Sequence, residues 1–309
     1  MKERAEAMVL ASFVADSHAL GAHGLYDQNE IARRFGTIEQ LLSPPPDSPF
    51  AAVPRGGFTR DGAQSLALLR SLVHTGAFDP DAFAESWRET SAGHDAYRNV
   101  PHGSAGDAAG SDLAPVARVA AIAYRYRDDL EQLVTTSRAQ CAATQPDRLS
   151  IDTAEYVARV LWHILNGRTP TASLRSVADA DAPAQIGALV TAGFDSMESP
   201  TPSTALRFGQ GRSIAEALPF CVHIVGKHEG SLKGALVDNL SAGGESAGRA
   251  AVIGMILGCF HGRDAIPDDW LEDLAAYREI SGLLEDLEAR VHRPAAAADR
   301  PFRSMPRRR

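Results

Sequence analysis

Apolar residues recur along this chain mainly at intervals of three and four, the spacing that places them on one face of an α-helix. The pattern is clear over residues 4–20, 63–73 and 270–291, and a Pro-Thr-Pro run interrupts it at 200–202. Further helical patterns cover residues 128–144, 150–166, 184–199, 213–226 and 231–239. No stretch alternates apolar and polar residues in the way that predicts paired strands. The pattern predicts an all-α fold.

The segment 241–262 places a diglycine, an acid (Glu245) and a hydroxyl (Ser246) directly before an apolar run. Glycine recurs every four residues in the run, at 254, 258 and 262, so these glycines are expected to line one helix face and admit a close neighbour. Free N–H groups at a helix start attract anions, and Glu245 is placed to take a cation or a proton. A core helix whose glycines only make packing room explains the spacing equally well. The run is far shorter than the roughly 20 residues of a membrane span.

Three other acid-bearing segments adjoin helical patterns. Asp16 stands late in the first apolar helix, where a buried carboxylate needs either a paired partner or a polar cleft. Thr59 and Asp61 precede the second helix, and capping of that helix explains them without any ligand. Ser111 and Asp112 end a glycine-rich connection and mark the start of another helix.

The composition narrows the class of protein. A chain of 309 residues, 44% of them hydrophobic, can bury a large core. A net charge of −8 argues against a nucleic-acid-binding surface and favours small molecules or proteins as partners. Cys141, Cys221 and Cys259 lack metal-binding spacing and are expected to be buried, reduced thiols. The first residues carry no signal-peptide pattern, so we expect a cytoplasmic protein.

The two ends of the chain differ in character. Residues 1–292 are expected to form a single domain, whereas 293–309 is a basic, proline-rich and alanine-rich tail. Such a tail buries too little apolar surface to fold alone, so we expect it to be disordered and dispensable. Contact of its arginines with nucleic acid is the alternative.

Taken in order, the loop motifs resemble those of the ADP-ribosylglycohydrolase family, and within it the bacterial branch that is similar to J1-type crystallins. Residues 15–27 (ADSHALGAHGLYD) look like the opening motif of that branch, and 111–118 look like its middle motif. Residues 243–249 (GGESAGR), followed by 266–270 (IPDDW), look like the family's ending. The order of the motifs carries the resemblance more than any one of them.

The resemblance implies a compact multi-helix fold whose loops converge on a cleft for two Mg²⁺ ions and an ADP-ribose unit. The reaction would be hydrolysis at the anomeric carbon of ribose. Residue by residue, it implies catalytic roles for Asp16, Asp61 and Glu245, and Mg²⁺ ligation by these three acids together with Thr59. Substrate contacts would come from His23, Tyr26, Ser111, Asp112, Gly243, Gly244, Ser246 and Arg249.

The chain departs from the family pattern at the expected metal site. Arg60 stands where the second motif, Thr-Asp-Asp-Thr, has an acid. Glu245, Ala247 and Gly248 stand where the ending, Gly-Gly-Asp-Thr-Asp-Thr, has two acids and the last hydroxyl. We hypothesise that Arg60 occupies part of the space of the second ion, and we expect one Mg²⁺ ion or none.

The leading expectation is a hydrolase of the ADP-ribosylglycohydrolase type that cleaves a ribosidic linkage of ADP-ribose with a degraded metal site. Its partners would be ADP-ribose or an ADP-ribosylated protein, with no membrane involved. Two alternatives stay open. One is a catalytically impaired protein that binds ADP-ribose or a nucleotide, and the other is a crystallin-like structural protein.

Overall fold

The computed structural model describes residues 1–92 and 110–291, which form helices joined by loops, with no strand among them. The all-α prediction is therefore confirmed. The first helices are α1 (Lys2–Ala19), α2 (Gln28–Phe35), α3 (Arg60–Thr75), α4 (Pro80–Ala92), α6 (Ala114–Ala117), α7 (Val119–Arg125), α8 (Leu130–Ala142) and α9 (Arg148–Leu165). They are followed by α10 (Pro170–Ala180), α11 (Ala184–Asp195), α12 (Thr201–Phe208), α13 (Ile214–Lys227), α14 (Leu232–Ser241), α15 (Ser246–His261), the 3₁₀ turn η2 (Arg263–Ala265), α16 (Asp268–Asp273) and α17 (Tyr277–Val291).

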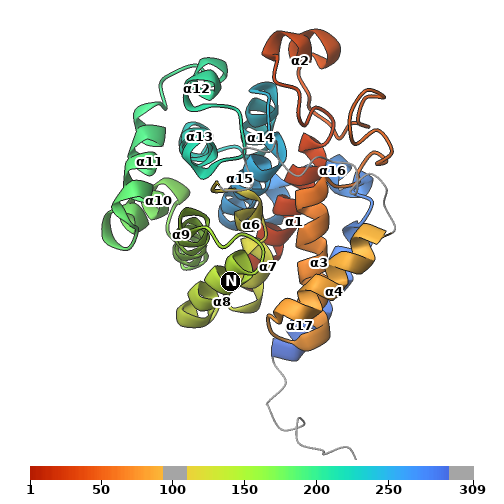
Figure 1. Ribbon diagram of the computed structural model, residues 1–309, viewed down its shortest axis with the longest axis vertical. Helices are drawn as coiled ribbons and strands as arrows, with labels where there is room; N and C mark the ends of the chain where they lie inside the picture. The colour runs from red at the N-terminus through yellow and green to blue at the C-terminus, as the bar shows by residue number, and fades with distance from the viewer. Residues whose placement is uncertain (93–109, 292–309) are drawn as a thin grey trace, which may run out of the picture.

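The helices α1 and α15 form the centre of the molecule, and the others are arranged around them (Figure 1). Every residue of α15 from Ser246 to Cys259 is buried, which is the pattern of a helix enclosed on all sides. A Cβ atom on Gly254 would lie 2.6 Å from the Ala11 carbonyl oxygen, so the two backbones touch. Gly258 faces Ala7 and Ala11 in the same way. The glycine spacing therefore serves close packing of α15 on α1.

The third glycine of that series has a different role. Gly262 ends α15 with a positive φ of 81°, and no atom lies within 4 Å of where its Cβ would be. The expectation that Gly262 lines the packing face is wrong. It ends the helix with a backbone conformation of positive φ that glycine adopts readily.

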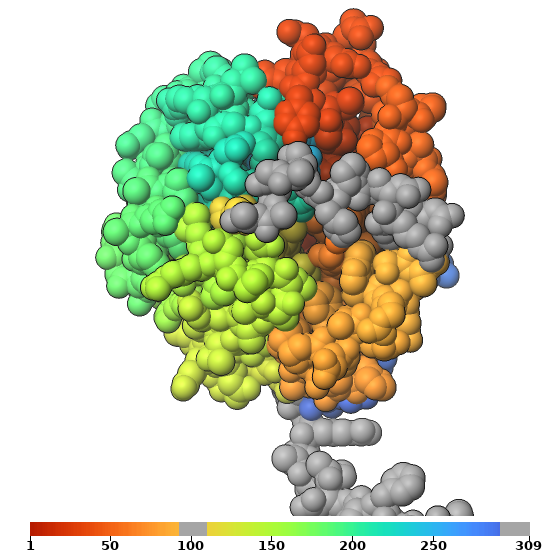
Figure 2. Space-filling model, viewed as in Figure 1, coloured from red at the N-terminus to blue at the C-terminus, as the bar shows by residue number. Residues whose placement is uncertain are grey.

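Two groups of helices flank the central pair. On one side α3 packs against α4 and α17, and on the other α9 packs against α8 and α10, while α13 packs against α11 (Figure 1). In the space-filling view, the red surface of the N-terminal segment meets the teal surface of α12 and α13 (Figure 2). The buried hydrophobic side chains of the described residues form one connected core. Segments far apart in sequence thus meet around the start of α15.

Some elements differ from the sequence-based expectation. The helix α12 begins at Thr201, inside the Pro-Thr-Pro run that was read as a break, because proline fits the first turn of a helix. The helices α2 and α10 lie in segments where no helix was predicted. The expected basic tail, 293–309, lies outside the described residues.

The cysteines and the membrane expectation can be checked directly. Cys141, Cys221 and Cys259 are buried free thiols, as expected, and burial raises the pKa of each to about 12. Within residues 1–92 and 110–291, no helix is both long and apolar enough to span a membrane. The cellular compartment stays a prediction.

Candidate functional site

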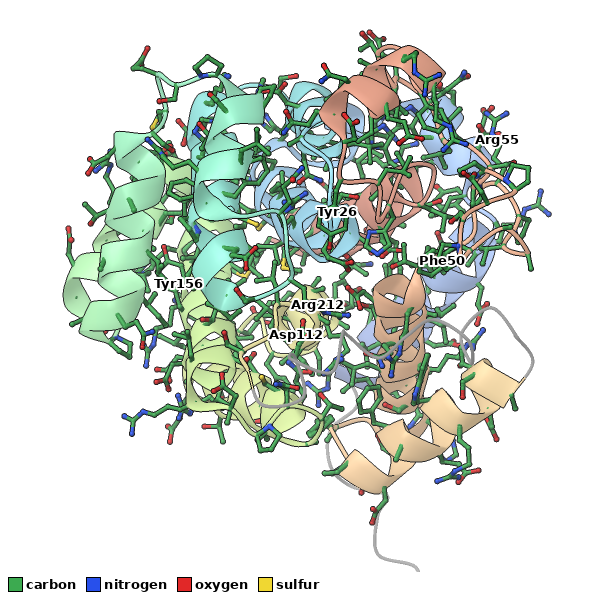
Figure 3. The ribbon with its side chains drawn as sticks, turned by 45° about the horizontal axis from the view of Figure 1, so that its top comes forward. Tyr26, Phe50, Arg55, Asp112, Tyr156 and Arg212 are labelled. Carbon is green, nitrogen blue, oxygen red and sulfur yellow. The ribbon has the colours of Figure 1, made fainter. Side chains whose placement is uncertain are left out.

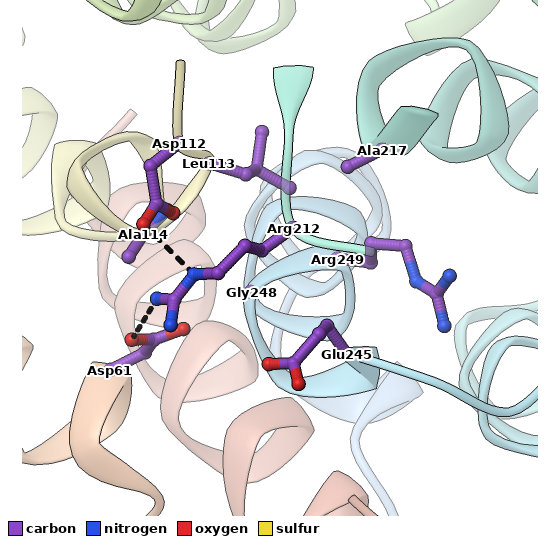
Figure 4. A pocket seen from close by; sticks show the side chains of 9 residues that line it. All are labelled: Asp61, Asp112, Leu113, Ala114, Arg212, Ala217, Glu245, Gly248 and Arg249. Atoms are coloured by element: carbon purple, nitrogen blue, oxygen red, sulfur yellow. Dashed lines mark hydrogen bonds and ion pairs between the residues drawn. The ribbon is translucent and has the colours of Figure 1, made fainter. Parts of the chain in front are cut away.

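A small polar cavity lies where three acid-bearing segments meet, at the N-terminal end of α15 (Figure 4). Its volume is about 10 Å³, room for about one water molecule. It is lined by Asp61, Asp112, Leu113, Ala114, Arg212, Ala217, Glu245, Gly248 and Arg249. Three predicted site acids, Asp61, Asp112 and Glu245, therefore converge on one place.

Asp16 binds the start of α3, the helix from which Asp61 reaches this cavity. Its buried carboxylate accepts the backbone N–H groups of Thr59 at 2.9 Å and Gly62 at 3.1 Å, and its Oδ2 lies 2.5 Å from the Thr59 hydroxyl. Burial raises the pKa of Asp16 to about 7, although these hydrogen bonds oppose the rise. Asp16 and Thr59 do not line the cavity. They fix the turn from which Asp61 reaches it.

The side chain of Arg212 lies between two of the acids. Its Nε is 2.8 Å from Asp112 Oδ2, and its Nη2 is 3.7 Å from Asp61 Oδ1 (Figures 3 and 4). Burial lowers the pKa of Arg212, but Asp61, Asp112 and Glu245 together outweigh it and raise that pKa above its ordinary value. Burial raises the pKa of Asp112, and the positive charge of Arg212 opposes this rise. Arg212 therefore stays a cation at the centre of an acidic cluster.

Two hydrogen bonds join the loop of Arg212 to that of Asp112. The Leu113 N–H donates to the Arg212 carbonyl at 3.0 Å, and the Ile214 N–H donates to Ser111 Oγ at 3.3 Å. Asp112 Oδ1 accepts the N–H of Ala114, the first residue of the short helix α6, at 2.8 Å. Ser111 thus holds the loop, while Asp112 faces the cavity.

Glu245 has two side-chain neighbours from the opening motif. The Tyr26 hydroxyl donates to Glu245 Oε1 at 3.3 Å, and His23 Nε2 lies 3.6 Å from Oε2. The Ala247 N–H donates to His23 Nδ1, so a neutral His23 carries its proton on Nε2, facing Glu245. Burial lowers the pKa of His23, which keeps the ring neutral at pH 7, and raises the pKa of Tyr26 to about 12. Glu245 is 28% exposed and is the most open acid of the cavity.

The diglycine shapes the turn that delivers Glu245. Gly243 and Gly244 have φ values of 74° and 79°, which favour glycine. Gly244 pairs with the opening motif in both directions: its N–H donates to the Leu25 carbonyl, and its carbonyl accepts the Gly24 N–H. Both glycines therefore act through the backbone here, and their contact with substrate stays a prediction.

Two further predicted residues lie at the start of α15. Arg249 is buried, donates from Nη2 to the Gly243 carbonyl and stacks 4.8 Å from the centre of the Phe220 ring. Burial lowers its pKa to about 10, and its side chain points away from Asp61 and Asp112 (Figure 4). Ser246 is buried, and its hydroxyl has no hydrogen-bond partner among the described residues. Neither geometry tests a substrate contact.

Comparison with known proteins identifies the family and the fold. A family model described as ADP-ribosylglycohydrolase matches residues 1–297. The chain belongs to the ADP-ribosylglycohydrolase family. Crystallin J1A of Tripedalia cystophora is 23% identical over 319 residues, covering 93% of this chain and 96% of the relative. A solved structure titled ADP-ribosylglycohydrolase-related protein complex has a TM-score of 0.71 at 21% identity, covering 94% of this chain and 98% of that one.

The predicted family and its relationship to J1-type crystallins are thus confirmed. In this member of the ADP-ribosylglycohydrolase family, the arginine that contacts the acids of the cavity is not the one that the sequence pattern indicated. Arg60 lies over the Trp87 ring, 5.9 Å from its centre, whereas Arg212 contacts Asp61 and Asp112. Arg212 belongs to none of the motifs and precedes α13 in a Gly-rich loop, so sequence reasoning missed it. The only sign of Arg212 in the sequence was its positive charge within that loop.

A magnesium centre of the kind that the family implies does not fit these residues. Mg²⁺ requires near-octahedral oxygen ligands. Both oxygens of Asp16 already accept hydrogen bonds from the start of α3, while Asp61 and Asp112 face Arg212. In the described part of the chain, no three His, Cys, Asp or Glu side chains are grouped to hold a metal.

Proposed function

We propose that this ADP-ribosylglycohydrolase relative hydrolyses a ribosidic linkage of an ADP-ribose unit at the cavity between Asp61, Asp112 and Glu245. The observation that carries the proposal is the convergence of these acids from three separate segments on one cavity. Family membership supports a hydrolase-like enzyme. Glycoside hydrolysis generally relies on carboxyl groups on either side of the scissile bond.

Glu245 is the best placed residue to activate water. It is the most exposed of the three acids, and Tyr26 and neutral His23 orient its two oxygens. A carboxylate so held can accept the proton of a water that attacks the anomeric carbon. Tyr26 and His23 are then positioning residues for Glu245.

Asp61 and Asp112 are suited to hold the ribose ring. Carboxylates accept hydrogen bonds from ribose hydroxyls, and their negative charge favours the oxocarbenium-like transition state. The cavity holds about one water, so a ribose ring enters only when the flexible Arg212 side chain swings aside. The proposed substrates are ADP-ribosylated proteins, whose ribose would enter the cavity after the Arg212 side chain reorients.

A second candidate function is binding of ADP-ribose without turnover. The specific observation in its favour is the position of Arg212, which partly neutralises Asp61 and Asp112. In that case the cleft would recognise the ligand but accelerate hydrolysis little.

The test is release of ADP-ribose from one N-linked and one O-linked ADP-ribosyl peptide. The wild-type protein should release ADP-ribose from at least one of them, and Glu245→Gln should lower the rate by about 100-fold, as expected for loss of a general base. Glu272→Gln, a change at an exposed acid of α16, is the matched control and should leave the rate unchanged. Calorimetric binding of ADP-ribose with no release would favour the second candidate. The absence of both binding and release would refute both candidate functions.

A further inference from the structure

The backbone around Arg212 is fixed from several directions. The Gly211 N–H donates to Glu216 Oε2 at 2.7 Å, and a Cβ on Gly211 would lie 2.7 Å from that same oxygen. Ser213 caps α13, and its hydroxyl donates to Glu216 Oε1 at 3.3 Å. The Leu113 N–H binds the Arg212 carbonyl. The fold therefore delivers Arg212 to the acids on a defined turn.

Arg212 offsets part of the negative charge around the cavity. Asp61, Asp112 and Glu245 carry three negative charges, and Arg212 meets two of these acids directly. The buried guanidinium of Arg249 points away from Asp61 and Asp112 (Figure 4). Carboxylate oxygens grouped in this way attract hard divalent cations, and a resident guanidinium repels them.

We infer that the guanidinium of Arg212 takes the place of a divalent cation between Asp61 and Asp112. This inference rests on the proposed function only in that both concern the same cavity. Its consequence is that the wild-type site does not require a divalent metal, and that removal of the Arg212 charge uncovers a metal site. Ala247 and Gly248 offer no ligand oxygen in their side chains, so the uncovered site would rely on the three acids.

The experiment titrates Mn²⁺ alone into metal-stripped full-length protein, with calorimetry and the paramagnetic resonance of free Mn²⁺ as readouts. Wild type should show no saturable binding tighter than about 1 mM, and Arg212→Met should bind one ion at least on the order of 100-fold more tightly. Arg207→Met is the matched control, because it removes an exposed arginine that lies over the Phe208 ring and does not line the cavity, and it should behave as wild type. Arg212→Lys keeps the charge and should also gain no site.

Circular dichroism and the melting temperature establish that each variant is folded, and Arg212→Gln replaces Arg212→Met if the latter does not fold. Tight Mn²⁺ binding by the wild type would overturn the inference. So would a folded, uncharged variant at 212 that gains no binding, or an equal gain in Arg207→Met. None of these readouts involves release of ADP-ribose, so failure of the proposed hydrolysis would leave their outcome unchanged.

Discussion

The Asp16 carboxylate lies 2.5 Å from the Thr59 hydroxyl, and this contact ties the central helix α1 to the first turn of α3. The two residues are 43 positions apart, and Asp16 also receives the N–H groups of Thr59 and Gly62. A buried carboxylate thus acts as the cap of a helix that belongs to a distant segment. This cap places Asp61 at the cavity.

Loss of the Asp16 carboxylate should destabilise the protein. Asp16→Ala leaves two backbone N–H groups and one hydroxyl without their buried acceptor, and each such group costs about 1–3 kcal/mol. Urea unfolding should show a loss of about 3 kcal/mol or more in the free energy of unfolding. As a control, Asp128→Ala, at an exposed acid, should change it by less than about 0.5 kcal/mol. Equal effects of the two substitutions would contradict the capping role.

The same residue predicts a pH dependence of stability. Burial raises the pKa of Asp16 from 3.8 to about 7, so the folded state binds a proton more tightly than the unfolded state. The associated stability is fully present below pH 3.8 and is lost as the pH rises through about 7. The free energy of unfolding of the wild type, relative to that of Asp16→Asn, should therefore fall between about pH 4 and pH 8. A flat difference over that range would refute this assignment.

Packing of α15 on α1 gives a prediction with an internal control. Gly254→Ala puts a methyl group 2.6 Å from the Ala11 carbonyl oxygen and should lower the free energy of unfolding by about 1–3 kcal/mol. Gly282→Ala, within α17, meets no atom within 4 Å and should raise it by about 0.5–1 kcal/mol, since alanine is the better helix former. Thermal or urea unfolding of the two variants measures both signs. Destabilisation by Gly282→Ala equal to that by Gly254→Ala would argue against backbone contact.

Removal of the Tyr26 hydroxyl should affect activity more than stability. The Tyr26 side chain is half exposed, and its hydroxyl donates to Glu245. Tyr26→Phe should slow ADP-ribose release by about 10-fold through lost orientation of Glu245, with the free energy of unfolding changed by less than about 1 kcal/mol. A comparison of kcat with the urea midpoint separates these effects. An unchanged kcat would show that Tyr26 does not position Glu245.

The helices and the close packing of the core were largely predictable, because they depend on local patterns. Apolar spacing located α1, α3, α9 and α17. Glycine spacing indicated that some helix packs closely on α15, and the structure shows that this helix is α1. The helices α2 and α10 are short, and the spacing of apolar residues did not predict them. The prediction that Asp16, Thr59, Asp61, Asp112 and Glu245 face one pocket holds for three of these residues. Asp61, Asp112 and Glu245 line the cavity, whereas Asp16 and Thr59 do not.

The positions of three side chains depend on tertiary structure and could not be predicted in the same way. Sequence reasoning left Asp16 either paired or facing a cleft, and the structure places it against the backbone of α3. Arg60 adjoins Asp61 in the sequence and was therefore expected at the same site. Adjacent residues of a helix point in different directions, however, and the Arg60 side chain extends over Trp87. Arg212 lies 100 residues beyond Asp112 in a loop without a motif, so only the fold brings them together.

A carboxylate site in which an arginine stands for the cation should work without added metal, so the rate of ADP-ribose release is compared in excess EDTA and in excess Mg²⁺. Wild-type protein should release ADP-ribose from an N-linked or O-linked peptide at the same rate in both conditions, and Glu245→Gln should abolish most of that release. Release that occurs only with Mg²⁺, or that persists undiminished in Glu245→Gln, would show that Arg212 does not replace a metal ion or that Glu245 does not activate water.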